Sequence, residues 1–175
     1  KSNAFRVDKN APTHISSSVS GEKYKDGTIY WIQPGDVLTV KLRQRDIISG
    51  NQRAYLRVNG NGQDVRYFHN FNNSSNTHLQ VVNSSFVNTS SVEIQSARRT
   101  EHDISTGYSA TEWKVKLNTS GHQYNIQYYY RDNANNNVGY NTFAIARVDG
   151  VAPTLNIVPN TTTNTNRNIT LTATA

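Results

Sequence analysis

Arg6-Val7-Asp8-Lys9-Asn10-Ala11-Pro12-Thr13 recurs as Arg147-Val148-Asp149-Gly150-Val151-Ala152-Pro153-Thr154, and only the central pair of residues differs. A short motif that returns at domain-sized spacing is typical of tandem modules. Each copy follows an apolar–polar alternation, which in the second copy uses Phe143, Ile145 and Val148. The Ala-Pro step then favours extended chain, because proline disfavours a helical conformation of the residue before it. We interpret each copy as the last strand of one module, a stiff joint and the first strand of the next.

This repeat divides the 175-residue chain into three parts. Residues 1–8 are predicted to be the last strand of a preceding module, residues 9–149 one complete module, and residues 150–175 the first strands of a following module. The two flanking pieces are too short to bury a core of their own. We therefore expect the chain to be a segment of a longer array.

Composition favours a solvated all-β protein with many turns. Hydrophobic residues make up only 35% of the chain, and Asn, Ser and Thr are abundant. The absence of cysteine excludes disulfides, thiolate metal sites and a cysteine nucleophile. No apolar run approaches the ~20 residues that cross a bilayer, so we expect no membrane insertion. The net charge of +6 is spread along the chain, which indicates a mildly basic surface and no nucleic-acid partner.

Period-two alternation of apolar and polar side chains predicts nine or ten strands and no helix. Pro34-Gly35 predicts a type II turn, and the Asn-Gly steps in residues 59–62 predict a tight hairpin. Many short strands separated by turns are typical of a β-sandwich. The expected strands are residues 11–19, 28–32, 37–43, 53–58, 64–69, 78–82, 92–97, 113–117, 124–130 and 139–148.

Three features resemble the bacterial immunoglobulin-like repeats of large secreted and cell-surface proteins. They are the joint at 148–154, the turn at 132–136, which is similar to an Asp-x-Ala-Gly-Asn turn, and the corner ending in Tyr124. The corner resembles a tyrosine corner, whose hydroxyl bonds to upstream backbone. Asn135 stands where the family has glycine, and asparagine tolerates the left-handed conformation that this place requires.

The resemblance implies an enlarged immunoglobulin-like β-sandwich, with Trp113 and Tyr124 as structural residues of its core. It also implies an extracellular location, either secreted or anchored at the cell surface or cell wall. The module is longer than the ~100 residues of a simple immunoglobulin sandwich, and the surplus lies in residues 71–106. We expect extra strands or a long ordered insertion there. Because loops on a rigid scaffold carry most binding sites, we expect any partner to contact residues 66–106.

No arrangement of residues in the sequence predicts an enzyme. The five histidines have no metal-ligand spacing and accompany no serine-nucleophile motif, and the carboxylates are too scattered to nominate a glycosidase pair. An intramolecular Lys–Asn cross-link is known in some surface adhesins, but no pattern here selects a pair.

Calcium is the one cofactor that the sequence suggests. Asp8 and Asp149 lie at the two joints, and Asp132 lies in a turn rich in asparagine oxygens. Loops with such hard oxygen ligands suit Ca²⁺, and related repeats in some large adhesins are stiffened by calcium at their junctions. The alternative is that each aspartate only caps its own turn.

A cluster of aromatic and polar residues suggests a second kind of site. Arg66, Tyr67, Phe68, His69 and Phe71 could form a stacking platform with polar flanks for a sugar. The alternative is that strand alternation buries half of them, since an aromatic run more often packs in a core.

The function expected from the sequence is a non-catalytic immunoglobulin-like module of a long bacterial surface or secreted protein. Such a module acts as a spacer and an adhesion unit. Its partners would be the neighbouring modules and a glycan or protein of a host or cell surface. The alternative is a carbohydrate-binding accessory module of a multidomain extracellular enzyme. An exposed coplanar aromatic cluster would favour that alternative, and buried aromatics would favour the spacer.

Overall fold

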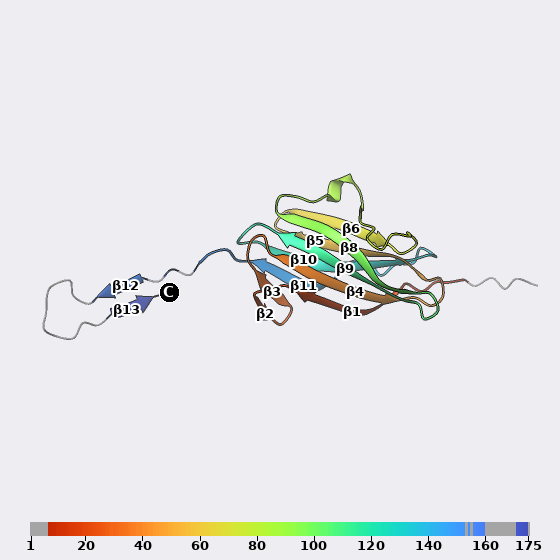
Figure 1. Cartoon of the computed structure of the whole chain (residues 1–175), viewed down its shortest axis with the longest axis horizontal. Helices are drawn as coiled ribbons and strands as arrows, with labels where there is room; N and C mark the ends of the chain where they lie inside the picture. Colours follow the sequence, from red (N-terminus) through yellow and green to blue (C-terminus); the bar gives the residue numbers. More distant parts are fainter. Residues whose placement is uncertain (1–6, 153, 155, 160–170, 175) are drawn as a thin grey trace, which may run out of the picture.

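The computed structural model describes residues 7–152, 154, 156–159 and 171–174 (Figure 1). Most of the strand expected at residues 1–8 and much of 150–175 lie outside the described residues. The strands are β1 (Thr13–Ser20), β2 (Tyr24–Asp26), β3 (Ile29–Ile32), β4 (Val37–Arg45), β5 (Asn51–Gly60), β6 (Gln63–Asn70), β7 (Gln80–Val81), β8 (Val92–Asp103), β9 (Tyr108–Leu117), β10 (Gln123–Asp132), β11 (Asn141–Val148), β12 (Asn156–Pro159) and β13 (Leu171–Thr174), with one short 3₁₀ helix, η1 (Ser84–Phe86), between β7 and β8.

Strands β1 to β11 form two sheets that face one another (Figure 1). One sheet has the order β1-β4-β9-β8, and the other has the order β2-β3-β11-β10-β5-β6-β7. These orders correspond to the A-B-E-D and G-F-C sheets of an immunoglobulin sandwich, with added edge strands. Strand β3 runs parallel to β11, whereas the other strand pairs are antiparallel. The expected all-β sandwich is confirmed. The pair β12–β13 forms a separate two-stranded sheet.

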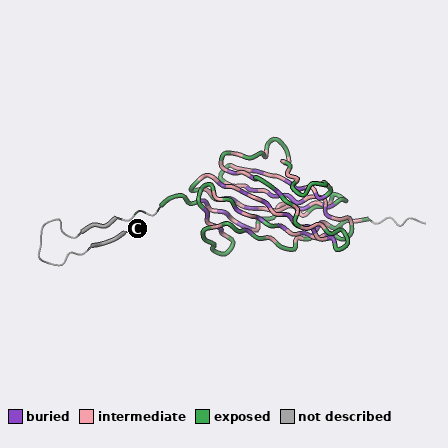
Figure 2. The backbone as a smooth tube through the Cα atoms, viewed as in Figure 1, coloured by how far each residue is buried: buried purple, intermediate pink, exposed green. Residues whose placement is uncertain are grey.

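The core lies between the sheets and is made by alternate residues of the long strands (Figure 2). On β4 and β9 the inward side chains are fully or almost fully buried, as the alternation predicted. Burial of each large apolar side chain contributes about 1.5–3 kcal/mol. The core residues include Leu38, Val40, Leu42, Trp113, Val115 and Leu117 from β4 and β9 of one sheet, and Leu56, Val58, Tyr124, Ile126 and Tyr130 from β5 and β10 of the other.

Both predicted turns are present. Gly35 has a φ of +88°, and the amide of Asp36 donates to the carbonyl of Gln33 at 3.1 Å, as a type II turn requires. Asn61 and Gly62, between β5 and β6, have φ values of +47° and +75°. Positive φ at both central residues is the signature of the type I′ hairpin turn that the Asn-Gly step predicts.

The alternation pattern did not predict three local features. Residues 21–27 fall between the expected strands but contain the three-residue strand β2, which is too short to leave an alternation pattern. Strand β8, expected at residues 92–97, extends to Asp103 and passes two irregularities to pair along the whole of β9. In β11 the buried residues are Ala144, Ala146 and Val148, whereas Phe143 lies at an irregularity in the pairing with β10 and packs against the core while only half-buried.

Two residues expected to be structural lie in the core. Trp113 is fully buried, and its indole Nε1 donates to Thr111 Oγ1 at 2.9 Å. Tyr124 is also fully buried, and burial raises the pKa of its hydroxyl. That hydroxyl is hydrogen-bonded to His122 Nδ1 at 2.9 Å, so its partner is an upstream side chain instead of the backbone expected for a tyrosine corner.

His69 is a buried titratable residue of the core. It points inward from β6, its Nδ1 donates to the carbonyl of His78 at 2.8 Å, and its ring meets Phe71 edge to face. Among the described residues its Nε2 has no hydrogen-bond partner. Burial lowers the pKa of His69 from 6.5 to about 4. Between these two values the unfolded chain binds a proton that the folded chain does not, so stability falls as the pH drops through that window.

We predict that His69 lowers the free energy of unfolding by roughly 3 kcal/mol between pH 7 and pH 4, because a tenfold difference in proton affinity between the folded and unfolded chain corresponds to about 1.4 kcal/mol. Urea denaturation at a series of pH values measures this. A His69→Gln variant, which cannot titrate, should show a shallower loss of stability over the same range. Identical pH dependence in the two proteins would contradict the prediction.

Candidate metal centre

Three acidic side chains meet near the start of the described chain. Figure 1 shows the end of the sandwich where the chain enters, on the right of the view. Asp8 precedes β1, Asp46 begins the β4–β5 loop, and Asp132 ends β10. One carboxylate oxygen from each lies within 4.8 Å of the other two. The site therefore joins the chain entering the module to two loops that the sandwich itself holds in place.

Asp132 is completely buried and organises the turn between β10 and β11. Its Oδ1 accepts from the amide of Asn136 at 2.7 Å, and its Oδ2 accepts from the Asn136 side chain at 2.8 Å. Asn135, within this turn, has a φ of +73°, a conformation that asparagine tolerates better than most residues. The same Asn136 side chain also donates to the carbonyl oxygens of Asp8 and Asn10 at 3.2 and 3.4 Å, which ties the entering chain to the turn.

Asp46 is nine-tenths buried and closes its own loop. Its Oδ1 accepts from the amides of Ile48 and Ser49 at 2.9 and 3.2 Å. Its own amide donates to the carbonyl of Gly107 at 2.9 Å. Gly107 has a φ of +75°, and a Cβ there would collide with the backbone of Asp46, so only glycine lets the β8–β9 turn approach this closely. Packing therefore fixes the position of the Asp46 carboxylate.

Asp8 is half-buried and turns the chain toward the cluster. Its Oδ1 accepts from the amide of Asn10 at 2.9 Å. This bond, together with hydrogen bonds from Ser49, holds the pKa of Asp8 below its usual value. Its Oδ2 is buried and has no hydrogen-bond partner among the described residues.

The cluster concentrates negative charge without a compensating cation from the protein. Among the residues that the structure describes, no lysine or arginine forms an ion pair with any of the three aspartates. Negative charges this close repel one another, and their burial weakens the screening by water. A bound cation would remove this repulsion. The three ligands are carboxylate oxygens, and such hard donors suit Ca²⁺ or Mg²⁺ better than zinc or copper.

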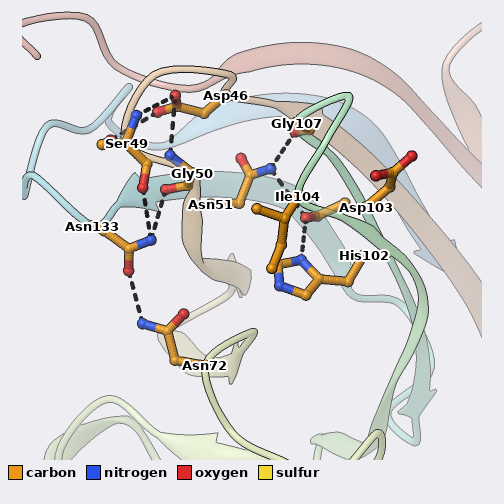
Figure 3. A pocket seen from close by; sticks show the side chains of 11 residues that line it. Asp46, Ser49, Gly50, Asn51, Asn72, His102, Asp103, Ile104, Gly107 and Asn133 are labelled. Atoms are coloured by element: carbon orange, nitrogen blue, oxygen red, sulfur yellow. Dashed lines mark hydrogen bonds between the residues drawn. The ribbon is translucent and has the colours of Figure 1, made fainter.

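A second unpaired oxygen lies beside the cluster. Asn51 is buried and stands opposite Asp132 in the β5–β10 pairing. Its amide nitrogen donates to the Gly107 carbonyl at 2.7 Å and to Ser109 Oγ at 3.0 Å (Figure 3). Its Oδ1 has no partner among the described residues. An unpaired buried amide oxygen costs free energy unless water or a cation meets it.

A cavity of about 100 Å³ opens next to Asp46 and Asn51 (Figure 3). Figure 3 shows Asn133 closing one side of it, with its amide nitrogen bonded to the carbonyls of Ser49 and Gly50 and its oxygen accepting from Asn72. One water needs roughly 10–15 Å³ of such space, so the cavity holds several. Of the three clustered aspartates, Asp46 lines this cavity, and Asp8 and Asp132 do not.

The structure brings together two of the three aspartates predicted for calcium. Asp149 is exposed at the opposite end of the module, where its amide donates to the Ile32 carbonyl at 2.8 Å. It has the same local geometry as Asp8, because its Oδ1 accepts from the amide of Val151 at 3.0 Å as Asp8 Oδ1 does from Asn10. The repeated sequence is therefore also a repeated turn.

The five residues predicted to form a sugar platform do not form one exposed surface. Strand alternation in β6 turns Arg66 and Phe68 outward, and Tyr67 and His69 inward. His69 and Phe71 are buried, and even Phe68 is only 5% exposed. Arg66 remains half-buried and pairs with Asp64.

The sequence analysis did not predict Asp46 or Asn51, because each lies far along the chain from Asp8 and no spacing connects them. It included Asn136 in the turn at 132–136 but did not predict its contact with the entering chain. Asp46 does carry a local signal, because it ends an alternating strand and precedes Ile47-Ile48-Ser49-Gly50, where an aspartate caps a turn. That signal predicts a turn and does not predict a metal ligand.

No model of a known protein family matches this chain, and no curated protein shows significant sequence similarity to it. Among the residues that the structure describes, no helix has the length and apolar character that a membrane crossing needs.

We predict that Asp132→Ala destabilises the module by about 1–3 kcal/mol even in EDTA, because the half-buried backbone amide and side chain of Asn136 lose their acceptor. Asp132→Asn keeps one acceptor oxygen and should cost less. Urea denaturation of the three proteins in EDTA makes the comparison. Equal stability of the alanine variant and the wild type would show that Asp132 does not organise the turn.

Proposed function

We propose that this chain is a non-catalytic, immunoglobulin-like spacer module of a long secreted or surface-anchored bacterial protein, and that a calcium ion fixes its N-terminal joint. The observation that carries the proposal is the meeting of Asp8 with Asp46 and Asp132. Asp8 belongs to the repeated joint, and the other two belong to the body of the module. An ion shared by all three attaches the joint to the body.

The physical effect of the ion is to remove freedom from the joint. Without it, Asp8 is held by hydrogen bonds from Asn10 and by the Asn136 side chain, and the charges of the three aspartates oppose this arrangement. When the calcium ion is bound, it attracts all three carboxylates, and this attraction holds the joint in place. Calcium accepts six to eight oxygens in flexible geometry, which suits ligands drawn from three separate loops better than the strict octahedron of magnesium does.

The repeated joint extends the proposal to the next module. Asp149 repeats both the sequence position and the local turn of Asp8. It would therefore donate to the calcium site of a following module, as Asp8 does to this one. In that arrangement each joint is stiffened by the module that follows it.

Calcium binding should stabilise the folded chain by mass action. At a free concentration 100 times the dissociation constant, the gain is about 2.7 kcal/mol, or roughly 5–10 °C in Tm for a domain of this size. Titration calorimetry and thermal melts with and without calcium measure both quantities. Asp46→Asn and Asp132→Asn should each weaken binding at least tenfold.

Two matched variants serve as controls for this experiment. Asp26→Asn removes an exposed carboxylate of β2 that lies outside the cluster, and Asp149→Asn removes the equivalent of Asp8 at the other end. Both should bind calcium like the wild type. No heat of binding together with an unmoved Tm in the wild type would end the calcium proposal.

Stiffening of the joint has its own signature in proteolysis. Lys9 follows Asp8 and is exposed, so trypsin cleaves after it when the joint opens. Calcium should slow this cleavage several-fold in the wild type and not in Asp46→Asn. Cleavage after Lys25, exposed on β2, should be unaffected and serves as the internal reference. Calcium binding without protection of Lys9 would mean that the ion does not restrain the joint.

A further inference from the structure

The outward face of β5, β6 and β10 carries side chains in regular rows. β5 pairs with β10 on one side and with β6 on the other, so residues opposite one another form rows across three strands. The inward members of these strands fill the core, which leaves arginine and aromatic rows alternating on the outside. From one end the outer rows are Arg131–Arg53–Asn70, Tyr129–Tyr55–Phe68 and Gln127–Arg57–Arg66.

The row containing Arg57 and Arg66 is neutralised from within the protein. Arg57 Nε and Nη2 both donate to the carboxylate of Asp64 at 2.8 Å, and Arg66 Nε donates to it at 2.9 Å. The hydrogen bond from Arg66 holds the pKa of Asp64 well below its usual range, and the guanidinium of Arg57 adds a smaller effect in the same direction. The guanidinium of Arg66 also lies 3.7 Å from the ring centre of Phe86. These groups satisfy one another and leave little capacity for a ligand.

The row containing Arg53 and Arg131 has no such partner. The two arginines are directly opposite in the β5–β10 register, where like charges are unfavourable. Within the described part of the chain neither forms an ion pair. Arg53 Nε is buried without a hydrogen-bond acceptor, and Arg131 Nε reaches only the neutral amide oxygen of Gln52 at 2.7 Å. Two adjacent guanidinium groups offer the paired donors that bind a carboxylate or sulfate through two oxygens.

An aromatic row lies directly beside this arginine pair. Tyr55 packs against Tyr129 edge to face, with ring centres 4.6 Å apart, and against Phe68 at 5.3 Å. The guanidinium of Arg53 lies 4.4 Å from the ring centre of Phe68, which orients its donors. Tyr55 and Phe68 are buried by these contacts, whereas Tyr129 stays half-buried at the surface beside Arg131. The ring of Tyr129 also packs against Tyr140, with ring centres 5.2 Å apart, which fixes its orientation. A partly exposed tyrosine suits contact with a sugar, because both are apolar on their faces and polar at one edge.

We propose that Arg53 and Arg131 bind the carboxylate or sulfate group of an acidic glycan, with Tyr129 contacting the adjoining sugar. The charge pattern favours this ligand over a nucleic acid strand. Single-stranded nucleic acids are bound by a basic groove that follows a chain of phosphates, with successive bases stacked on exposed rings. Here the one unneutralised arginine pair lies in a row that ends at the neutral Asn70. The aromatic row separates it from the other arginine row, which is already paired to Asp64. The site does not depend on the proposed calcium ion.

The test is binding of defined hexasaccharides to the intact chain, measured by titration calorimetry in EDTA. The probes are a galacturonic acid hexamer, a heparin-derived hexasaccharide and the neutral cellohexaose. We expect at least one acidic hexamer to bind and the neutral one not to bind. Arg53→Gln and Arg131→Gln should each weaken binding at least tenfold. Arg53→Lys and Arg131→Lys, which keep the charge but lose the paired donors, should show an intermediate loss.

Arg98→Gln is the matched control, because it makes the same change of charge on the other sheet, where the Arg98 side chain is 59% exposed. It should bind within twofold of the wild type, and all variants should keep a Tm close to the wild type. The proposal is overturned if neither acidic hexamer binds, if cellohexaose binds equally well, or if Arg98→Gln weakens binding as much as Arg53→Gln. It is also overturned if inorganic sulfate binds as tightly as the hexamers, or if a thymidine hexanucleotide binds more tightly than they do.

Discussion

Alternate burial along two facing sheets is the constraint on which the other features of this module depend. Because successive side chains of a strand point to opposite faces, the choice of Leu38, Val40 and Leu42 for the core fixes their neighbours outside. The same rule in β5 and β10 places Leu56 and Ile126 inside and leaves Arg53 and Arg131 outside. Figure 2 shows this alternation of buried and less buried residues along the long strands. A shift of register by one residue would exchange the core for the arginine rows, so the core determines the outer surface.

The end of the sandwich that carries Asp46 and Asp132 is organised by backbone hydrogen bonding instead of by alternate burial. There the strands stop, and backbone groups that no longer pair with a neighbour need other partners. Asp46 and Asp132 supply them by accepting from the amides of their own loops. Gly107 allows the β8–β9 turn to come close enough to join this network. The result is a set of buried carboxylates whose positions are already fixed by turn geometry, and a cation would need to order only Asp8 to complete its site.

The two proposed sites use the same scaffold in different ways. The acidic cluster lies where the chain enters, so an ion bound there would affect how the proposed module is held to one before it. The arginine pair lies on the outward face of the larger sheet, which would remain exposed in the proposed array. A spacer stiffened at its joints would present such faces at regular intervals. Weak binding of a single acidic sugar would then be strengthened by repetition, because linked sites bind a long polymer at a high effective concentration.

The sequence by itself determined the fold class, the core of the long strands and the two tight turns, because these depend on neighbours within a few residues. Leu38 to Leu42, Pro34-Gly35 and Asn61-Gly62 carry their own local signals. The repeat around Asp8 and Asp149 likewise singled out Asp8, one member of the acidic cluster. Only the tertiary structure decided that Asp46 joins Asp8 and Asp132 and that Asn51 lies opposite Asp132, since residues far apart in the chain meet there through sheet pairing and loop packing. It also separated Arg66 from the buried His69 and Phe71, and it set Arg53 opposite Arg131. Local pattern specifies which face a side chain takes, but register and loop packing specify which distant side chain it meets.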